Sequence, residues 1–588
     1  MPFLDYLVIA VYLGLMVGVG LYVQRKASAG IEGFFLGNRK IPWWALGASG
    51  MASNLDVSGT MIIAALVYAI GVQGFYIEIR GGVVLVMAFL MVFMGKWNRR
   101  SQVMTVAEWM TFRFGEGPQG KAARLLSATA NLVFTVGAIT YFAQGLGIFV
   151  GTLLGIPPAV ATYAMIALAT VYTVASGLYG VVYTDVFQGV LIFFVVIYVC
   201  AYTFTGYSLP DAFDVSVPLG AGAFETVRTS LAQWADWRPS WTLDLPGEYA
   251  QYNLFGVAVM FYMLKVMIEG FSGSGGYMIQ RFFASSSDRE AGLLSLFWIT
   301  LLAFRWPFVI SIAILGIVYG VENGAIANPE EVLPIVIMEY MPVGIRGLLI
   351  AGLIAAAMST FDSTVNSGAA YWVKDIYQYL IKPEADEKTL VWQGRAASIL
   401  LVLIGVAFTF AFDSLNDVWG WLTMGLGAGI MIPQLVRWYW WRFNGYGYAG
   451  GTFAGMVLAI VVRLFFDLDE ISTFIAIAAG TFFATIVCTL VTQPTDDATL
   501  TRFYEITKPF GFWGHIASAM PTPAATAIRS ETRQDLISLA VAVPWQLCLF
   551  LTPMVFMTKQ WPLFWPLFAS LGILTVLLYV VWFRRLKS

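Results

Sequence analysis

The segment Arg346–Val373, RGLLIAGLIAAAMSTFDSTVNSGAAYWV, decides the fold because it is both apolar and crowded with polar groups. Its length suits a transmembrane helix, which needs about 20 apolar residues. Positions i, i+3, i+4 and i+7 share one face of a helix. The sequence therefore predicts a stripe of oxygen-bearing side chains, formed by Ser359, Asp362, Ser363 and Asn366, with Thr360 beside it.

Such a stripe is typical of a site for a hard cation such as Na⁺, by analogy with the oxygen ligands of calcium and magnesium. The alternative is that the Ser and Thr hydroxyls only bond neighbouring helices, which is common in membranes. Asp362 favours the cation site, because a carboxylate inside a membrane is costly and usually functional.

The composition supports a membrane protein around this helix. Hydrophobic residues make up 59% of the 588 residues and charged residues only 12%, with a mean hydropathy of +0.75. A soluble chain normally carries about a quarter charged residues. Three scattered cysteines and one histidine, His515, predict neither a disulfide framework nor a zinc site. The net charge of −2 indicates no nucleic-acid partner.

Apolar runs of sufficient length predict an all-α polytopic membrane protein with about 15 transmembrane helices. Lys and Arg concentrate in alternate loops, which places the N-terminus outside and the C-terminus inside. We expect an integral protein of the bacterial inner membrane, monomeric or weakly dimeric. The first apolar run has no basic n-region or small-residue cleavage site, so it is expected to be a retained helix.

Two of the predicted helices are interrupted in the same way. Trp43–Leu66, WWALGASGMASNLDVSGTMIIAAL, and Phe261–Arg281, FYMLKVMIEGFSGSGGYMIQR, each place a Gly/Ser cluster inside an apolar span. Paired breaks at matching positions of two halves indicate a transporter binding site, although glycines can also serve only close helix packing. The expected organisation is a helix and loop at 1–40, two five-helix repeats at 41–206 and 251–443, an extracellular loop at 207–250 between them, and peripheral helices at 444–588 with a cytoplasmic loop at 492–535.

Ionisable residues at membrane depth mark candidate binding groups, because such residues usually face a cavity or a partner. They are Asp56, Glu78, Arg80, Asp185, Lys265, Glu269 and Arg305. Lys265 and Glu269 have helical i, i+4 spacing, so a purely structural ion pair is an equal alternative. Arg305 suits bidentate contact with a carboxylate, although it could instead pair with Glu269.

At these residues the chain resembles the sodium:solute symporter family. The motifs are IPWWALGASGMASN, VVYTDVFQ, GYMIQR, MSTFDSTVNS and VKDIY, in the family's order. The resemblance implies a leucine-transporter-type fold with an inverted repeat of five plus five helices, and alternating access driven by Na⁺.

The resemblance also implies two sodium sites. The main site would use the carbonyls of Ala52, Leu55 and Ala356 and the hydroxyls of Ser359 and Thr360; a second alignment register would move two carbonyls to Asn54 and Val57. The second site, present in some members, would use Asp185, Ser359, Asp362 and Ser363, where Asp362 replaces a small or hydroxyl residue. Two carboxylates in one cavity would also let protons compete with Na⁺.

The solute site implied by the resemblance is less similar to that of the sugar carriers. Glu78 falls where sugar members carry a sugar-binding carboxylate, Ile268 replaces their Asn, and Phe271 matches an aromatic inner gate. The expected substrate-binding residues are Asn54, Glu78, Arg80, Glu269, Phe271, Ser272 and Arg305.

Together these features predict a Na⁺-coupled symporter for a small polar solute that is sugar-like or bears a carboxylate. Alternatives are a proton-coupled symporter of the same fold for an amino acid or organic acid, and a transporter-like membrane sensor. A sensor would need an appended signalling domain, for which 492–535 is too short. No nucleophile–base pair, metal-ligand cluster or phosphate-binding loop in the sequence supports an enzyme.

Overall fold

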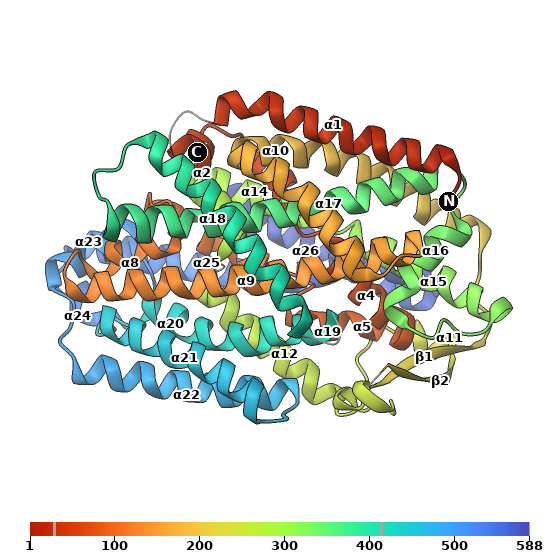
Figure 1. Ribbon diagram of the computed structural model, residues 1–588. Helices are drawn as coiled ribbons and strands as arrows, with labels where there is room; N and C mark the ends of the chain where they lie inside the picture. Colours follow the sequence, from red (N-terminus) through yellow and green to blue (C-terminus); the bar gives the residue numbers. More distant parts are fainter. Residues whose placement is uncertain (28–30, 221, 274, 412–414, 587–588) are drawn as a thin grey trace.

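A computed structural model describes residues 1–27, 31–220, 222–273, 275–411 and 415–586. Long helices run side by side along one direction of the molecule (Figure 1). The N-terminus and a β-hairpin lie at one end of the bundle, and α23 and α24 lie at the other (Figure 1).

The first half of the helical chain contains the first break. Its helices are α1 Phe3–Ala27, α2 Ile31–Leu36, α3 Trp43–Ala52, α4 Val57–Ile70, α5 Gly74–Ile77, α6 Val86–Phe89, α7 Gly95–Arg100, α8 Val106–Phe114, α9 Pro118–Leu154 and α10 Pro158–Gly206. The next segment holds β1 Ala212–Gly220, β2 Ala223–Ser230 and α11 Leu231–Trp234.

The second half contains the second break and the C-terminal helices. The helices up to the end of the expected repeat are α12 Phe255–Ser272, α13 Gly276–Phe283, α14 Asp288–Leu302, α15 Arg305–Asn323, α16 Val332–Tyr340, α17 Ile345–Ala370, α18 Glu387–Ala407, α19 Leu415–Gly420 and α20 Gly427–Tyr439. Beyond them lie α21 Gly445–Phe465, α22 Glu470–Val491, α23 Asp497–Thr507, α24 Gly514–Ala517, α25 Thr522–Met557 and α26 Trp561–Val581.

Short turns of tighter or wider helix join several of these elements. The tighter turns are Gly37–Arg39, Gly71–Gln73, Glu78–Arg80, Gly247–Tyr252, Pro329–Glu331, Phe408–Ala411 and Phe583–Arg585. The wider π-helical turns are Leu90–Met94, Tyr371–Ile381 and Trp421–Leu426. π-helical turns inside α-helices occur frequently at functional sites.

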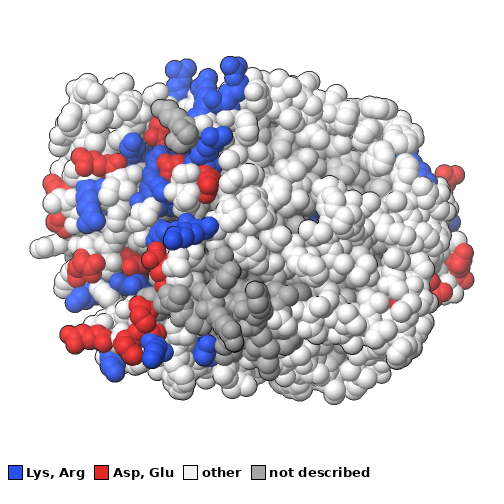
Figure 2. Space-filling model, turned by 90° about the horizontal axis from the view of Figure 1, so that it is seen from above, with Lys and Arg blue, Asp and Glu red and all other residues white. Residues whose placement is uncertain are grey.

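The chain is predominantly helical, as predicted. Among the described residues, 11 helices are long and apolar enough to cross a membrane, so the count of about 15 is not confirmed. One reason is that α10 is a single element of 49 residues, about twice the length that one membrane span needs. Figure 2 shows charged side chains gathered at the two ends of one face, with a largely uncharged band between them, which is the pattern of a protein that spans a bilayer.

Both predicted helix breaks are confirmed. The first separates α3 from α4 at Ser53–Asp56, where the Asp56 side chain caps α4 by accepting from Gly59 N at 2.6 Å. The second lies between α12 and α13 and begins at Gly273, whose φ of +80° favours glycine. Each break interrupts the backbone hydrogen bonds inside the bundle, so carbonyl and N–H groups are left for other partners.

The expectation of an all-α chain is wrong for the segment between the two repeats. β1 and β2 form an antiparallel pair in which Val215 lies opposite Val227. Phe213, Val215 and Val217 are all buried, and apolar β-branched or aromatic residues at every second position suit a β-strand. The helical search for membrane spans missed it because the run is too short to cross a bilayer.

The C-terminal helix α25 contacts the core of the bundle. Its Phe550 ring stacks on Trp306 of α15 at a centroid distance of 5.8 Å. Its Gln546 side-chain amide donates to the Val84 carbonyl at 3.1 Å. The segment 492–535, expected as a loop, contains α23, α24 and the first turns of α25.

Candidate functional site

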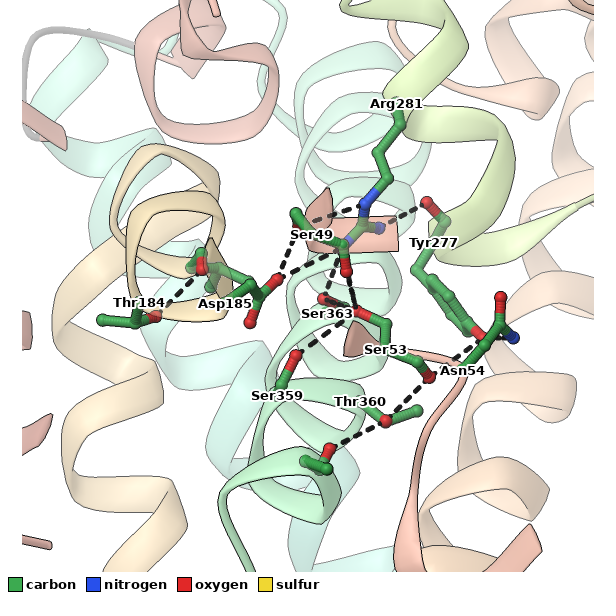
Figure 3. Close-up of polar contacts among 12 residues, drawn as sticks. Ser49, Ser53, Asn54, Thr184, Asp185, Tyr277, Arg281, Ser359, Thr360 and Ser363 are labelled. Atoms are coloured by element: carbon green, nitrogen blue, oxygen red, sulfur yellow. Dashed lines mark hydrogen bonds and ion pairs between the residues drawn. The ribbon is translucent and has the colours of Figure 1, made fainter. Parts of the chain in front are cut away.

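The polar stripe of α17 lies directly against the first helix break (Figure 3). The Thr360 hydroxyl is within hydrogen-bond distance of the Ser53 carbonyl, at 2.8 Å, and of the Ala356 carbonyl, at 3.0 Å. The Ser53 hydroxyl lies 3.4 Å from that of Ser359 and 3.2 Å from that of Ser363. The structure therefore brings the oxygen atoms of α17 and those freed at the break into one buried cluster.

The expected ligands of the main sodium site divide into two groups. Ala356, Ser359 and Thr360 lie against the break, as the contacts above show. In the break itself the Ala52 carbonyl accepts from Leu55 N at 3.2 Å within a turn. The Asn54 carbonyl, a ligand in the alternative register, already accepts from Arg305 Nη1 at 2.9 Å, so a cation there would have to share this oxygen.

Arg281 is the residue of this cluster that the sequence did not reveal. It ends the second interrupted helix and is 0% exposed, and its guanidinium reaches into the cluster from α13 (Figure 3). Its Nη2 donates to the hydroxyls of Ser49 at 2.8 Å, Ser53 at 3.0 Å and Ser363 at 3.0 Å. A protein cation thus lies among residues expected for the second sodium site.

Asp185 faces this guanidinium from α10. Its Oδ2 accepts from the Ser49 hydroxyl at 2.5 Å and lies 3.5 Å from Arg281 Nη2. Its Oδ1 is buried and has no hydrogen-bond partner among the described residues. An orphaned carboxylate oxygen beside serine hydroxyls fits a Na⁺ ligand. Asp362, the other expected carboxylate, is also buried, at 2% exposure.

A separate cavity of about 260 Å³ lies beside the two breaks. Six of the seven residues expected to bind the solute line it: Asn54, Glu78, Arg80, Glu269, Ser272 and Arg305. Phe271, the expected inner gate, is not among its described lining residues, and its ring packs on Phe89 at a centroid distance of 5.1 Å. The polar part of the wall also includes Asp56, Asn131, Tyr141, Lys265, Tyr277, Thr423 and Gln434.

Most charges in the cavity wall are paired. Lys265 Nζ lies 2.8 Å from Glu269 Oε2 and donates to the Arg80 carbonyl at 2.5 Å, so the structural ion pair considered for this spacing is present. Arg80 pairs with Glu78 Oε1 at 3.1 Å. These contacts hold the charged groups in place without a ligand.

Arg305 differs from the other cations of the cavity. It is 3% exposed, and Nη1 donates to the Asn54 carbonyl, but Nε and Nη2 have no hydrogen-bond partner among the described residues. Nε and Nη2 form one edge of the planar guanidinium, the geometry that binds a carboxylate through two parallel hydrogen bonds. Gly59 leaves room at this edge, because a Cβ there would lie 2.7 Å from Arg305 Nη2.

Thr360→Ala tests the cluster between α17 and the break. The substitution removes the hydroxyl that contacts the Ser53 carbonyl while alanine keeps the helix. We expect a several-fold higher Na⁺ concentration for half-maximal uptake, with the folded protein retained, because one oxygen is lost from the proposed site. Uptake measured against Na⁺ concentration checks this, with Thr364→Ala on the same helix as the control. Unchanged Na⁺ activation in Thr360→Ala would contradict the site.

Two broken helices, a polar helix packed against one of them and a buried cavity of charged groups together define an ion-coupled membrane transporter. A model of the sodium:solute symporter family matches residues 34–458, and the chain belongs to this family. Na⁺ is accordingly its coupling ion, and the protein is a transporter rather than an enzyme.

Individual relatives within the family agree with this assignment. The chain is 26% identical over 500 residues to a sodium/glucose cotransporter of Vibrio parahaemolyticus, covering 80% of this chain and 86% of the relative. It is 26% identical over 483 residues to a sodium/sialic acid symporter of Proteus mirabilis, covering 78% and 85%. A solved Na⁺-coupled sialic acid symporter in an outward-open state matches the fold with a TM-score of 0.65 and 20% identity, covering 84% of this chain and 99% of that structure.

Proposed function

We propose that the protein imports, together with Na⁺ and by alternating access, a small solute that bears a carboxylate and also hydroxyl or amino groups. The observation that carries this proposal is the Nε–Nη2 edge of Arg305, which is buried, lies in the cavity wall and lacks a hydrogen-bond partner among the described residues. A buried cation with unused donors is costly unless a ligand completes its bonding.

The acidic side chains of the same cavity would bind the hydroxyl or amino groups of the solute. Asp56 Oδ2 and the Tyr141 hydroxyl lie 3.0 Å and 3.2 Å from the point where a Gly59 Cβ would stand. They therefore lie close to the free edge of Arg305. Carboxylate oxygens accept hydrogen bonds from hydroxyl or ammonium groups. A solute with a carboxylate and with hydroxyl or amino groups would therefore bond both Arg305 and these acceptors.

The proposed main sodium site consists of Ala52, Leu55, Ala356, Ser359 and Thr360, next to this cavity. These residues would hold Na⁺, which would supply a positive charge to the oxygens of α17 and of the break. The hydroxyl of Thr360 and the carbonyl of Ser53 already hold the two elements in contact. The Asn54 side chain bonds Trp298 and Tyr277, while its carbonyl bonds Arg305, so the break connects the ion site to the solute cavity.

The direction of transport rests on the loop charges. We propose that the N-terminus and the β1–β2 hairpin lie outside a bacterial inner membrane, and that the C-terminus lies inside, because Lys and Arg favour cytoplasmic loops. The hairpin end and the α23–α24 end are opposite ends of the bundle (Figure 1).

A neutral sugar is the second candidate solute, favoured by Glu78, which falls at the sugar-binding carboxylate of the sugar members. A ligand screen on the purified protein separates the two. The expected result is a rise in melting temperature with uronates or amino acids that is larger in Na⁺ than in K⁺, because a ligand stabilises the state it binds. Stabilisation by neutral sugars alone would overturn the carboxylate assignment, and no effect of Na⁺ would overturn the coupling.

A further inference from the structure

A second, larger cavity lies at the hairpin end of the molecule. It has a volume of about 830 Å³ and is lined by the turn Gly247–Tyr252, the segment Leu415–Leu426 and the connection between α21 and α22. Phe465 and Phe466 in its wall are 75% and 58% exposed, so this outer cavity opens at the surface. It shares no described lining residue with the 260 Å³ central cavity that contains Arg305.

One helical segment separates the two cavities. Along Leu415–Leu426, Trp419, Leu422 and Thr423 line the central cavity, whereas Gly420, Trp421 and Met424 line the outer one. The two cavities therefore meet opposite faces of the same wall, and a passage between them must lie at its edge.

Arg80 fills that edge. It lines the central cavity and is 0% exposed, while its partners Glu470 and Asn416 line the outer cavity. Arg80 Nη1 forms an ion pair with Glu470, and Nη2 donates to Asn416 Oδ1 at 2.5 Å. Gly420 permits this approach, because a Cβ there would lie 2.8 Å from Glu470 Oε1.

The same guanidinium has two further partners. Nη2 lies 3.1 Å from Glu78 Oε1, and Nη1 donates to the Tyr252 hydroxyl at 3.2 Å. Glu470 in turn accepts from the Tyr262 hydroxyl of α12 at 3.3 Å. If Arg80 separated from Glu470, it would still be paired with Glu78. The contact with Glu470 can therefore open without leaving the buried charge of Arg80 unpaired.

We propose that the Arg80–Glu470 ion pair, supported by Asn416, is a gate between the outer cavity and the central cavity, and that solute entering from the hairpin end passes when this pair separates. Glu470 is the first residue of α22, outside both five-helix repeats, so a peripheral helix controls access to the core. This inference rests on the transport function proposed above, because that function makes the outer cavity a route by which solute enters.

Reaction of a cysteine at position 423 with a membrane-impermeant maleimide tests the gate. Thr423 lines the central cavity behind Arg80, and its hydroxyl donates to the Trp419 carbonyl of the same helical segment. Thr423→Cys is placed in a chain from which Cys200, Cys488 and Cys548 have been removed. Sealed vesicles with the hairpin end outward restrict the reagent to one side. Neither solute nor an ion gradient is present, so a failure of the gate is distinguishable from a failure of the transport proposal.

Adding Glu470→Gln should accelerate labelling about tenfold, because a hydrogen bond between two charged groups is replaced by a weaker one. The matched control is Asp417→Asn, which weakens the Arg463–Asp417 pair, 2.6 Å apart and half-exposed in the same outer cavity, and should leave the rate unchanged. If Glu470→Gln does not fold, Asn416→Ala should give the same acceleration. An unchanged rate in the gate variant, or an equal rise in the control, would overturn the proposal.

Discussion

Arg281→Gln is expected to lower the stability of the protein by about 3–5 kcal/mol, because it leaves the buried carboxylate of Asp185 without its cation. Both side chains are 0–1% exposed, and Nη2 of Arg281 also bonds three serine hydroxyls, from α3, the first break and α17. The measurement is a clear fall in the melting temperature of the purified protein.

Asp185→Asn should be destabilising for the converse reason, since it leaves the guanidinium of Arg281 buried among neutral groups. The double variant should lose less than the sum of the two single variants, because the uncompensated charge is removed with its partner. Arg463→Gln serves as the control, since its ion pair with Asp417 is 40% and 30% exposed and such a pair contributes about 0–1 kcal/mol. Additive losses in the double variant, or an equal loss in the control, would show that Arg281 and Asp185 are not coupled.

The elements predicted from the sequence were those with a local signal. The stripe of α17 follows from helical spacing, and both breaks follow from Gly/Ser clusters inside apolar runs. The lining of the central cavity was also largely predictable, because an ionisable side chain inside a membrane segment marks a cavity or a partner. This argument selected Glu78, Arg80 and Arg305 without any knowledge of how the helices pack.

The missed features depend on contacts between distant segments. Arg281 follows the second break, and its partners Ser49, Asp185 and Ser363 come from three other elements. The partner of Arg80, Glu470, lies 390 residues away. Local periodicity carries no information about such pairs. The β1–β2 hairpin is a different case, because its strands are too short to resemble membrane spans.

Arg305→Gln is expected to abolish recognition of an acidic solute while leaving the protein folded. Two charge-assisted hydrogen bonds from the Nε–Nη2 edge contribute about 1.5–3 kcal/mol each, so their loss should weaken apparent affinity by a factor of about 100 or more. Arg305→Lys should fall between the parent and Arg305→Gln, because lysine keeps the charge but loses the planar fork.

Competition for Na⁺-driven uptake into proteoliposomes measures this, using the acid found in the ligand screen and its primary amide as competitors. The parent protein should prefer the acid strongly, because only the carboxylate matches the charged edge of Arg305. The glutamine variant should bind acid and amide about equally. In the parent, the amide leaves the buried charge of Arg305 unpaired, and the variant no longer has that charge. Thr423→Ser, which changes another residue of the cavity wall without altering its charge, is the control and should keep the parent's preference.

If Arg305→Gln still preferred the acid, another cation of the cavity would have to hold the carboxylate. Lys265 is paired with Glu269, and Arg80 is paired with Glu78 and Glu470. We therefore do not expect either cation to hold the carboxylate of the solute.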